Sequence, residues 1–444
     1  MKRILLALAL ILAVQVADAQ ATADAARKSI DKATEATLNP KKSGKVATWL
    51  ALGKAYRGAY NQPTAQVVRN VSKTYLNEMM TEKPSSEVSV VVSDTPMTKQ
   101  IYSDKELYFD GNGNLVMIYV TKFPVEDPLY KAFEAYMKAQ ELDVEGSKTK
   151  DIVAALEEIS RNYVIDAETD FHLGDFMGSS IKFEKAAEVA AAAPLSRPDG
   201  MCISNAALAA HRVPDLARAR GLYEKAIQMG YYDEGNVFLR LSVVCNELGD
   251  KAAQRAALEE AVEKLPENKD ALTYLIDFYL QNDEDPAKLF DLTAKAIAQN
   301  PTAAYPYYAQ GTLYDKLAQS DLAKAEEYIA LGAASFDKAA EVEPAYVFSY
   351  VGKGHMYCKR ADELNSQASA EMDDAKWRAL VDKANEAIEA AIAPLEKVYE
   401  LSDQEQNKIW AATLLKECYY RVREKNPEYE AAYNKYNEIV KANR

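Results

Sequence analysis

The sequence repeats with a period close to 34 residues, and this period constrains the fold more than any other feature. Small or apolar anchor residues recur at intervals of 33, 35, 34 and 35 residues. The anchors are Gly174, Ala207, Ser242, Ile276 and Gly311. A unit this short cannot bury its apolar face alone, so neighbouring units must stack to complete a core. The chain is therefore expected to fold as an array of repeated units.

The second half of several units carries a small, an aromatic and another small residue at intervals of four and three. These intervals place all three side chains on one face of an α-helix. The members are Ala132, Tyr136 and Ala139, then Ala219, Tyr223 and Ala226, and finally Phe336 with Ala339. The small residues allow two helices to approach closely, and the aromatic ring fills the space between units. Each unit is therefore expected to be a pair of packed helices.

The first unit opens with a specific motif, in which Trp49, Leu52, Gly53 and Tyr56 stand at Trp-x2-Leu-Gly-x2-Tyr spacing. This motif, together with the period, resembles the first helix of a tetratricopeptide (TPR) repeat. The resemblance implies an all-α fold, a right-handed TPR superhelix of about seven to eight helix pairs. It covers residues 20–444, with a lead-in helix in 20–41 and a C-terminal cap in 403–444.

The whole chain also resembles the exported TPR proteins that are common in Bacteroidetes. The residues that carry this match are Phe133, Tyr136, Lys138, Ala139, Glu141, Leu142 and Asp143. The resemblance implies a periplasmic scaffold that binds a partner protein or peptide, within an envelope complex for example, and it names no ligand.

Residues 62–126 interrupt the first repeat and differ in character from the rest of the chain. Residues 65–80 are compatible with a helix, whereas 87–92, 105–109 and 115–121 are rich in β-branched and aromatic side chains. The last two segments flank the sequence Asp-Gly-Asn-Gly-Asn at 110–114, which favours a β-hairpin. Two roles remain open for this insertion: a flap that covers one end of the array, or a docking edge for a partner.

Residues 1–19 have the composition of a cleavable signal peptide. Lys2 and Arg3 precede an apolar run from Ile4 to Val16, and Ala17-Asp18-Ala19 has the form that signal peptidase cleaves. We expect cleavage after Ala19 and a periplasmic or secreted protein. The first cysteine is Cys202, so no lipid anchor is expected at the cleavage point, and no later segment is long and apolar enough to span a membrane.

The formal net charge of −14 disfavours nucleic acid as a partner and favours a cationic or polar peptide. Four cysteines, Cys202, Cys245, Cys358 and Cys418, stand far apart and in no metal-binding spacing. Each lies in an apolar helical pattern, which favours buried thiols, although pairing in an oxidising compartment stays open.

The motifs of common enzymes are missing from the sequence. His172, His211 and His355 have no zinc-site spacing, and Gly111-Asn112-Gly113 does not precede a helix as a phosphate-binding loop would. The acidic run 283–285 lacks the spacing of a calcium loop. We therefore expect no enzyme activity, no cofactor and no metal.

The first helices of a TPR array line its concave surface, where the ligand is chosen. Alignment with the carboxylate clamp of chaperone-binding members places Phe171, Asp175, Asn205, Asn236 and Arg240 at the clamp positions. Both clamp lysines are missing, so a chaperone tail is not expected. Asn205, Asn236 and Arg240 remain as a polar patch able to hydrogen-bond an extended peptide, although a merely solvated groove explains them equally well.

Tyrosine is abundant, with 28 residues against 11 phenylalanines, and it clusters in two adjacent units. The cluster comprises Tyr305, Tyr307, Tyr308, Tyr314, Tyr346, Tyr350 and Tyr357. Because a tyrosine ring suits contacts with sugars and peptides, an alternative function is a soluble glycan- or peptide-capture component of an outer-membrane uptake system. The competing interpretation is ordinary packing between repeats.

Overall fold

The computed structural model describes residues 22–68, 71–282 and 285–443. The expected signal peptide, residues 1–19, lies outside this part of the chain. The chain divides into two compact units, unit 1 (residues 1–251) and unit 2 (residues 252–444). Among the described helices, none combines the length and apolar character that a membrane span requires.

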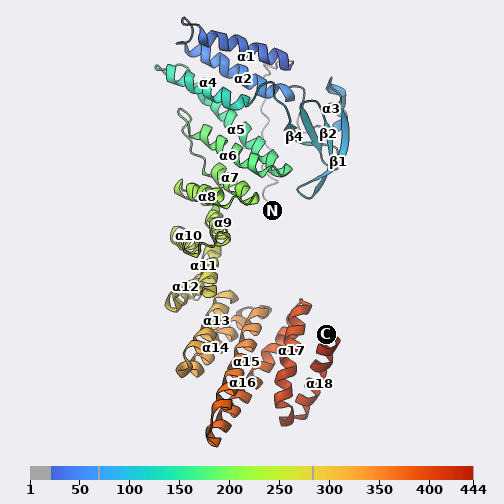
Figure 1. Ribbon diagram of the computed structural model, residues 1–444, viewed down its shortest axis with the longest axis vertical. Helices are drawn as coiled ribbons and strands as arrows, with labels where there is room; N and C mark the ends of the chain where they lie inside the picture. Colours follow the sequence, from blue (N-terminus) through green and yellow to red (C-terminus); the bar gives the residue numbers. More distant parts are fainter. Residues whose placement is uncertain (1–21, 69–70, 283–284, 444) are drawn as a thin grey trace. The chain divides into compact units, whose positions relative to one another are not determined.

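Unit 1 consists of helices that pack in consecutive pairs, with a small sheet at one side (Figure 1). The paired helices are α2 with α4, α5 with α6, and α7 with α8, and α1 packs on α2. The bounds are α1 Ala23–Leu38, α2 Val46–Asn61, α3 Lys73–Met79, α4 Pro128–Leu142, α5 Thr149–Leu173, α6 Phe176–Ala191, α7 Gly200–Arg212, α8 Leu216–Gln228 and α9 Asn236–Glu247.

Unit 2 continues the same plan, with pairs α11/α12, α13/α14, α15/α16 and α17/α18. Helices α13 and α14 are 17 and 18 residues long and are joined through a short 3-10 turn, Leu322–Lys324, which makes the interval from Gly311 to Gly354 longer than the usual period. The expectation of an all-α, TPR-type array is confirmed. The bounds are α10 Lys251–Lys264, α11 Lys269–Gln281, α12 Pro286–Gln299, α13 Ala304–Ser320, α14 Ala325–Val342, α15 Val347–Ala370, α16 Asp374–Leu401, α17 Glu405–Val422 and α18 Pro427–Ala442.

Helix pairs approach most closely where a glycine of the first helix meets a large side chain of the second. A Cβ atom placed on Gly53 of α2 would lie 2.8 Å from the ring of Tyr136 in α4. The same distance separates a Cβ on Gly311 from the ring of Phe336, which is fully buried. These contacts confirm the predicted role of the small and aromatic residues, because any larger residue than glycine would push the two helices apart.

One of the predicted anchors is wrong. Gly174 does not lie on a packed helix face but ends α5, with a left-handed φ of 87°. Such a residue lets a helix terminate and the chain turn, and glycine adopts this conformation without strain. The structural equivalent is Ala167, which is fully buried and precedes Phe183 by 16 residues, the same interval by which Ala207 precedes Tyr223.

The insertion folds into a four-stranded antiparallel sheet in the order β1-β2-β3-β4. The predicted strands and the hairpin at 110–114 are present, and β2 is a further strand that was not predicted. It follows a two-residue turn, Ser93-Asp94, whose φ angles of 47° and 63° are unusual for residues other than glycine and asparagine. The helix expected in 65–80 is shortened to α3. The strand bounds are β1 Ser86–Val92, β2 Thr95–Ile101, β3 Lys105–Phe109 and β4 Leu115–Val120.

The insertion has a hydrophobic core of its own. Helix α3 packs on one face of the sheet through Leu76, which is fully buried against Leu107, Phe109 and Leu115. On the other side, β4 contacts α5 (Figure 1). The insertion is therefore a small folded module that rests on the helical array.

The close contact at Gly53 predicts how two glycine substitutions differ. Gly53→Ala should lower the free energy of unfolding by about 1–3 kcal/mol, because the new methyl group overlaps the immobile Tyr136 ring. Gly221→Ala is the matched control, since Gly221 lies exposed in α8 with no atom near the added methyl group. It should raise stability by about 0.5–1 kcal/mol through higher helix propensity. Denaturant unfolding monitored by circular dichroism measures both, and equal effects would refute the close-packing explanation.

Candidate functional site

The insertion meets the array beside an ion pair that joins two helices of the array, α5 and α6. Asp170 of α5 is buried, and its carboxylate lies 2.7 Å from Nζ of Lys182 in α6. Burial raises the pKa of Asp170, although Lys182 opposes the rise. Tyr119 of β4 lines a cavity of about 20 Å³ beside this pair. That volume holds about one water molecule, so this interface is a packed contact and not a ligand pocket.

Two further contacts, made by Phe123 and Ser93, hold the module on α2 and α5, which are themselves joined by a hydrogen bond. The Tyr60 hydroxyl in α2 donates a hydrogen bond of 2.9 Å to Asp166 in α5, and its ring stacks on Phe123 at 5.3 Å. At the β1–β2 turn, Ser93 Oγ lies 3.1 Å from Nδ1 of His172. The module therefore contacts α2 and the C-terminal part of α5.

The outer edge of the sheet is apolar. Within the described residues β1 pairs only with β2, and Val88 and Val91 are 40% and 70% exposed. The contacts of the insertion with α2 and α5 and the unpaired edge of β1 are thus compatible with both roles, a cover and a docking edge.

The predicted polar patch lies on α7 and α9. Asn236 is the first residue of α9, and its side-chain amide donates to the backbone carbonyl of Asp233 at 2.8 Å. Arg240 is half-buried and donates to the Asp233 carboxylate at 3.4 Å. Asn205 of α7 is half-buried and shares no hydrogen bond with either residue in the described part of the chain. Asp233 thus links Asn236 to Arg240, while Asn205 stands apart.

Two of the aligned clamp positions do not lie on this face. Phe171 packs its ring edgewise on Phe176 at 5.1 Å, in the turn between α5 and α6. Asp175 caps the start of α6 by accepting a 2.9 Å hydrogen bond from the Gly178 amide. The alignment placed both residues in the clamp because it took Gly174 as the anchor of the second repeat.

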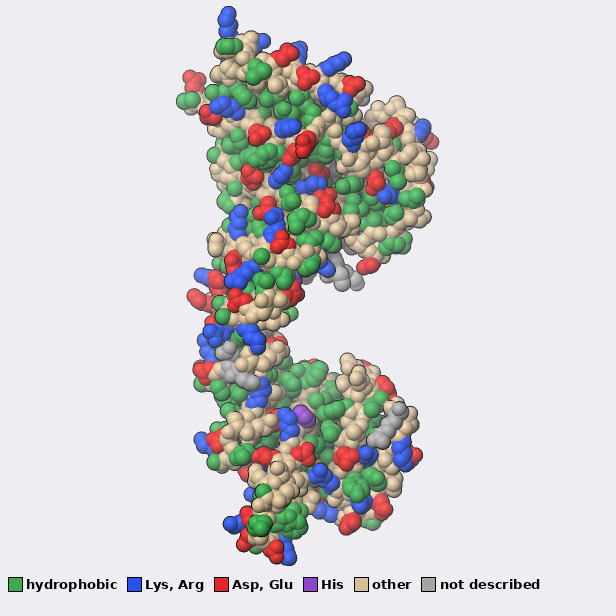
Figure 2. Space-filling model, in the orientation of Figure 1, with side chains coloured by type: hydrophobic (Ala, Val, Ile, Leu, Met, Phe, Trp, Pro, Cys, Tyr) green, Lys and Arg blue, Asp and Glu red, His purple; other side chains and the backbone are tan. Residues whose placement is uncertain are grey.

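Glu168 stands one residue after Ala167, the correct anchor of the second repeat. The alignment on Gly174 therefore did not place Glu168 among the candidate site residues. Glu168 is half-buried on α5, and burial alone raises the pKa of its carboxyl group. Its charge also raises the pKa of the Cys202 thiol in α7, after burial and Asp199, which have the larger effects. No hydrogen bond or ion pair to Glu168 is present among the described residues. Elsewhere on unit 1, acidic and basic side chains are interspersed, as Figure 2 shows for one face.

Cys202 borders Glu168 and is not a nucleophile. Its thiol is buried and donates a 3.2 Å hydrogen bond to Asp199, which also caps the start of α7. Burial and the neighbouring Asp199 carboxylate raise the pKa of the thiol far above its usual range. The group remains a neutral thiol at physiological pH, whereas a reactive cysteine needs its thiolate.

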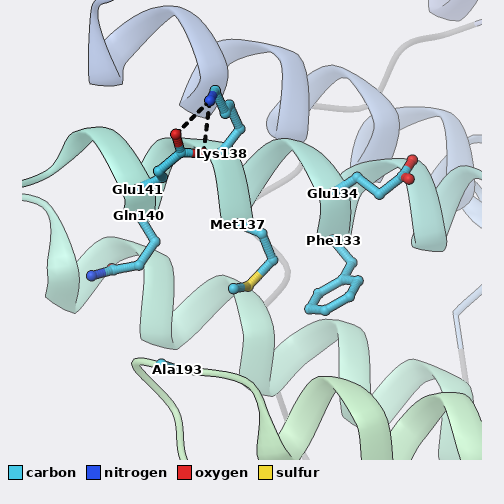
Figure 3. Close-up of a pocket in the computed structure, with 7 residues that line it drawn as sticks. All are labelled: Phe133, Glu134, Met137, Lys138, Gln140, Glu141 and Ala193. Atoms are coloured by element: carbon cyan, nitrogen blue, oxygen red, sulfur yellow. Dashed lines mark hydrogen bonds and ion pairs between the residues drawn. The ribbon is translucent and has the colours of Figure 1, made fainter.

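A shallow pocket of about 530 Å³ lies between α4 and the connection from α6 to α7 (Figure 3). Phe133, Met137 and Gln140 point from α4 toward the side of Ala193, whereas Lys138 and Glu141 pair with each other at 2.7 Å. The pocket thus offers an apolar floor and a rim on which Lys138 and Glu141 neutralise each other while Glu134 adds a further carboxylate.

The tyrosine cluster of unit 2 is largely engaged in packing. Tyr305 donates a hydrogen bond to Asp277, and Tyr308 makes ring contacts with Tyr346 at 5.9 Å and Phe336 at 6.0 Å. Phe348, a phenylalanine beside the tyrosine cluster, is 55% exposed to solvent. Burial raises the pKa of Tyr346, which keeps its hydroxyl protonated. The arrangement favours the packing interpretation of the cluster over a sugar-binding platform.

The described residues contain no group of three or more histidine, cysteine or acidic side chains placed to hold a metal ion. Asp285, from the acidic run 283–285, caps α12 by accepting a hydrogen bond of 2.9 Å from the Ala287 amide. The other two residues of the run lie outside the described part of the chain.

Comparison with known proteins gives only distant likenesses. No protein-family model matches the chain, and no curated protein matches it. The solved structure of YrrB, a TPR protein with an unusual peptide-binding site, is 19% identical over 47% of this chain and 97% of its own, with a TM-score of 0.34. A TPR protein from Parabacteroides merdae is 15% identical over 64% and 96%, with a TM-score of 0.38. A TPR protein from Bacteroides fragilis is 12% identical over 63% and 99%, with a TM-score of 0.30.

The raised pKa of Glu168 predicts a pH-dependent effect of Glu168→Gln. An ionised carboxylate that is desolvated without a partner lowers stability, so the neutral amide should stabilise the protein at pH 7. Because the folded-state pKa lies above the ordinary value of 4.5, this gain should shrink as the pH falls through the raised pKa and vanish below about 4.5. Denaturation midpoints at pH 7 and pH 4 measure it. Glu145→Gln, at an exposed loop position, is the control and should change little. Destabilisation by Glu168→Gln at pH 7 would mean that the carboxylate has a structural partner.

Proposed function

We propose that this chain is a non-enzymatic, exported scaffold that binds an extended, cationic segment of a partner protein. The segment lies along the first-helix face of unit 1, defined by Glu168, Asn205, Asn236 and Arg240. The face runs from the edge of the inserted module across α7 and α9.

The half-buried and unpartnered carboxylate of Glu168 carries this proposal. A desolvated carboxylate gains more from a cationic partner than one in water does, because the surrounding dielectric constant is lower and burial has already removed part of its hydration. Asn205 adds an amide that can bond the backbone of an extended chain. Arg240 is neutralised by Asp233, so it does not repel a cationic segment. The net charge of −14 favours the same class of ligand.

The non-enzymatic part of the proposal rests on the state of the candidate catalytic groups. Cys202 is held as a neutral thiol. His211 is bound to Glu247 at 2.8 Å, and His172 lies against Ser93. Acyl transfer uses a nucleophile, a base and a group that orients the base. Cys202, His211 and His172 do not form such a set with one another.

A positional peptide library tests the proposed ligand class. Immobilised extended peptides that carry lysine or arginine should bind the full chain better than their glutamate counterparts. Glu168→Gln should weaken that binding about tenfold, which corresponds to one charge-assisted hydrogen bond. Glu145→Gln removes an exposed carboxylate of the same type and should leave binding within twofold, apart from a general salt effect.

Two results would contradict the proposal. Equal binding by the wild-type chain and Glu168→Gln would remove Glu168 from the site. Binding to a glycan library in the absence of any peptide binding would favour the capture of carbohydrate, for which the tyrosine-rich region of unit 2 is the first place to look.

Export to the periplasm is supported by the composition of residues 1–19, with Lys2 and Arg3 ahead of the apolar run that starts at Ile4. The mature protein recovered from its native host should begin at Gln20, as determined by N-terminal peptide mass spectrometry, and should fractionate with periplasmic proteins. A mature chain that retains Lys2 and Arg3 would contradict export by this route.

A further inference from the structure

Two cysteines that are distant in the sequence meet in unit 2. Cys358 of α15 and Cys418 of α17 are 60 residues apart, and their Sγ atoms lie 3.9 Å from each other. All four cysteines of the chain are free thiols in the structure. At this distance the two thiols share a hydrogen bond, whereas a disulfide bond needs the sulfurs at about 2.05 Å. To form the bond, the two sulfurs must come closer to each other than they lie in the structure.

The helices that carry the two cysteines are held together beside them. One turn further along each helix, Asp362 of α15 and Arg421 of α17 form an ion pair of 3.6 Å. Cys418 also belongs to the core that unites α15 to α18, together with the buried residues Ala361 and Leu415, and Cys358 packs at its margin. The approach of the two sulfurs is therefore fixed by the surrounding packing.

We propose that Cys358 and Cys418 are a disulfide site, and that in an oxidising compartment the bond between them ties the C-terminal helices α17 and α18 to the array. The proposal is independent of the ligand of unit 1. It requires an oxidant of the disulfide class, either a small-molecule disulfide or a disulfide-bonded oxidoreductase.

The first step falls to Cys358, because it is half-buried while Cys418 is buried. The hydrogen bond from Cys418 and the positive field of Arg421 lower the pKa of Cys358, while the pKa of Cys418 is raised. The Cys358 thiolate attacks one sulfur of the oxidant, and the other sulfur leaves as a thiolate. Cys418 then loses its proton and attacks the Cys358 sulfur of this mixed disulfide, which releases the second thiolate. Two electrons and two protons pass from the cysteines to the oxidant, which leaves as two thiols.

Within the described residues, the pair α17/α18 packs against α16 and has no further helix pair on its other side. A pair with a neighbour on one side separates from a stack more readily than one held on both sides. A cross-link that closes a loop of 60 residues removes conformational freedom from the unfolded chain. The expected result is a C-terminal end that stays docked.

The other two cysteines provide the contrast. Cys202 and Cys245 are buried in unit 1, and within the described residues neither lies in contact with the sulfur atom of another cysteine. Cys202 donates its thiol hydrogen to Asp199 instead. If all four cysteines oxidised equally readily, no pair would be favoured. The contact between their sulfur atoms favours a bond between Cys358 and Cys418.

The test is oxidation of the full chain with oxidised glutathione, followed by mass spectrometry without reduction. The intact mass should fall by two hydrogen atoms, and trypsin should release peptides 354–359 and 417–421 joined to each other. The thermal midpoint of the transition that includes α15 to α18 should rise by about 10 °C on oxidation. Cys202→Ala should retain the cross-link and the rise. Cys358→Ser, at the less buried position, should lose both while keeping the helical circular dichroism of the reduced wild-type chain.

Any of three results would overturn the proposal. The cysteines could stay reduced at an oxidant concentration that oxidises a model dithiol, or the cross-link could join other cysteines. A cross-link between Cys358 and Cys418 that leaves the thermal midpoint unchanged would show that the bond does not hold the terminal helices.

Discussion

The structure depends on one contact that recurs along the chain, in which a small residue of a first helix accepts a large side chain of its partner. Gly53 accepts Tyr136, Gly311 accepts Phe336, and Gly354 accepts Leu395. Because these contacts fix each pair at close range, the apolar surface that remains faces the next pair and forces the units to stack. The same geometry leaves the polar side of the first helices uncovered, and that side is where a partner segment can lie.

The fold could be predicted in outline because the close contact leaves a trace in the sequence, as a small residue and an aromatic at fixed spacing. The failures have physical causes. Glycine occurs both where helices pack closely and where a helix ends in the left-handed conformation. Gly174 was therefore taken as a packing anchor, although it ends α5 and Ala167 is the packed residue. Strand β2 was missed because Ser93 and Asp94 make its turn, where glycine or asparagine is usual. Nothing in the repeat pattern marks the division between the two units at residues 251 and 252.

The candidate site was less predictable than the fold. Asn205, Asn236 and Arg240 were chosen by alignment, and the sequence gives no indication that Asp233 engages two of them. Glu168 is one of many carboxylates in an acidic chain, and only its burial without a partner distinguishes it. A desolvated carboxylate is a cost to the folded protein that a bound cation would offset, which is the usual relation between stability and function at a binding site.

The ionisation of Glu168 offers the most direct test of this account. Carbon-13 labelling of the glutamate carboxyl groups, with assignment from Glu168→Gln, allows its pKa to be read from an NMR titration. The account predicts a pKa above 4.5 in the free protein, and a fall when a lysine- or arginine-containing peptide binds, because the bound cation stabilises the charged form. A pKa that is already ordinary in the free protein, or one that does not move in the complex, would contradict the claim that this carboxylate receives the partner.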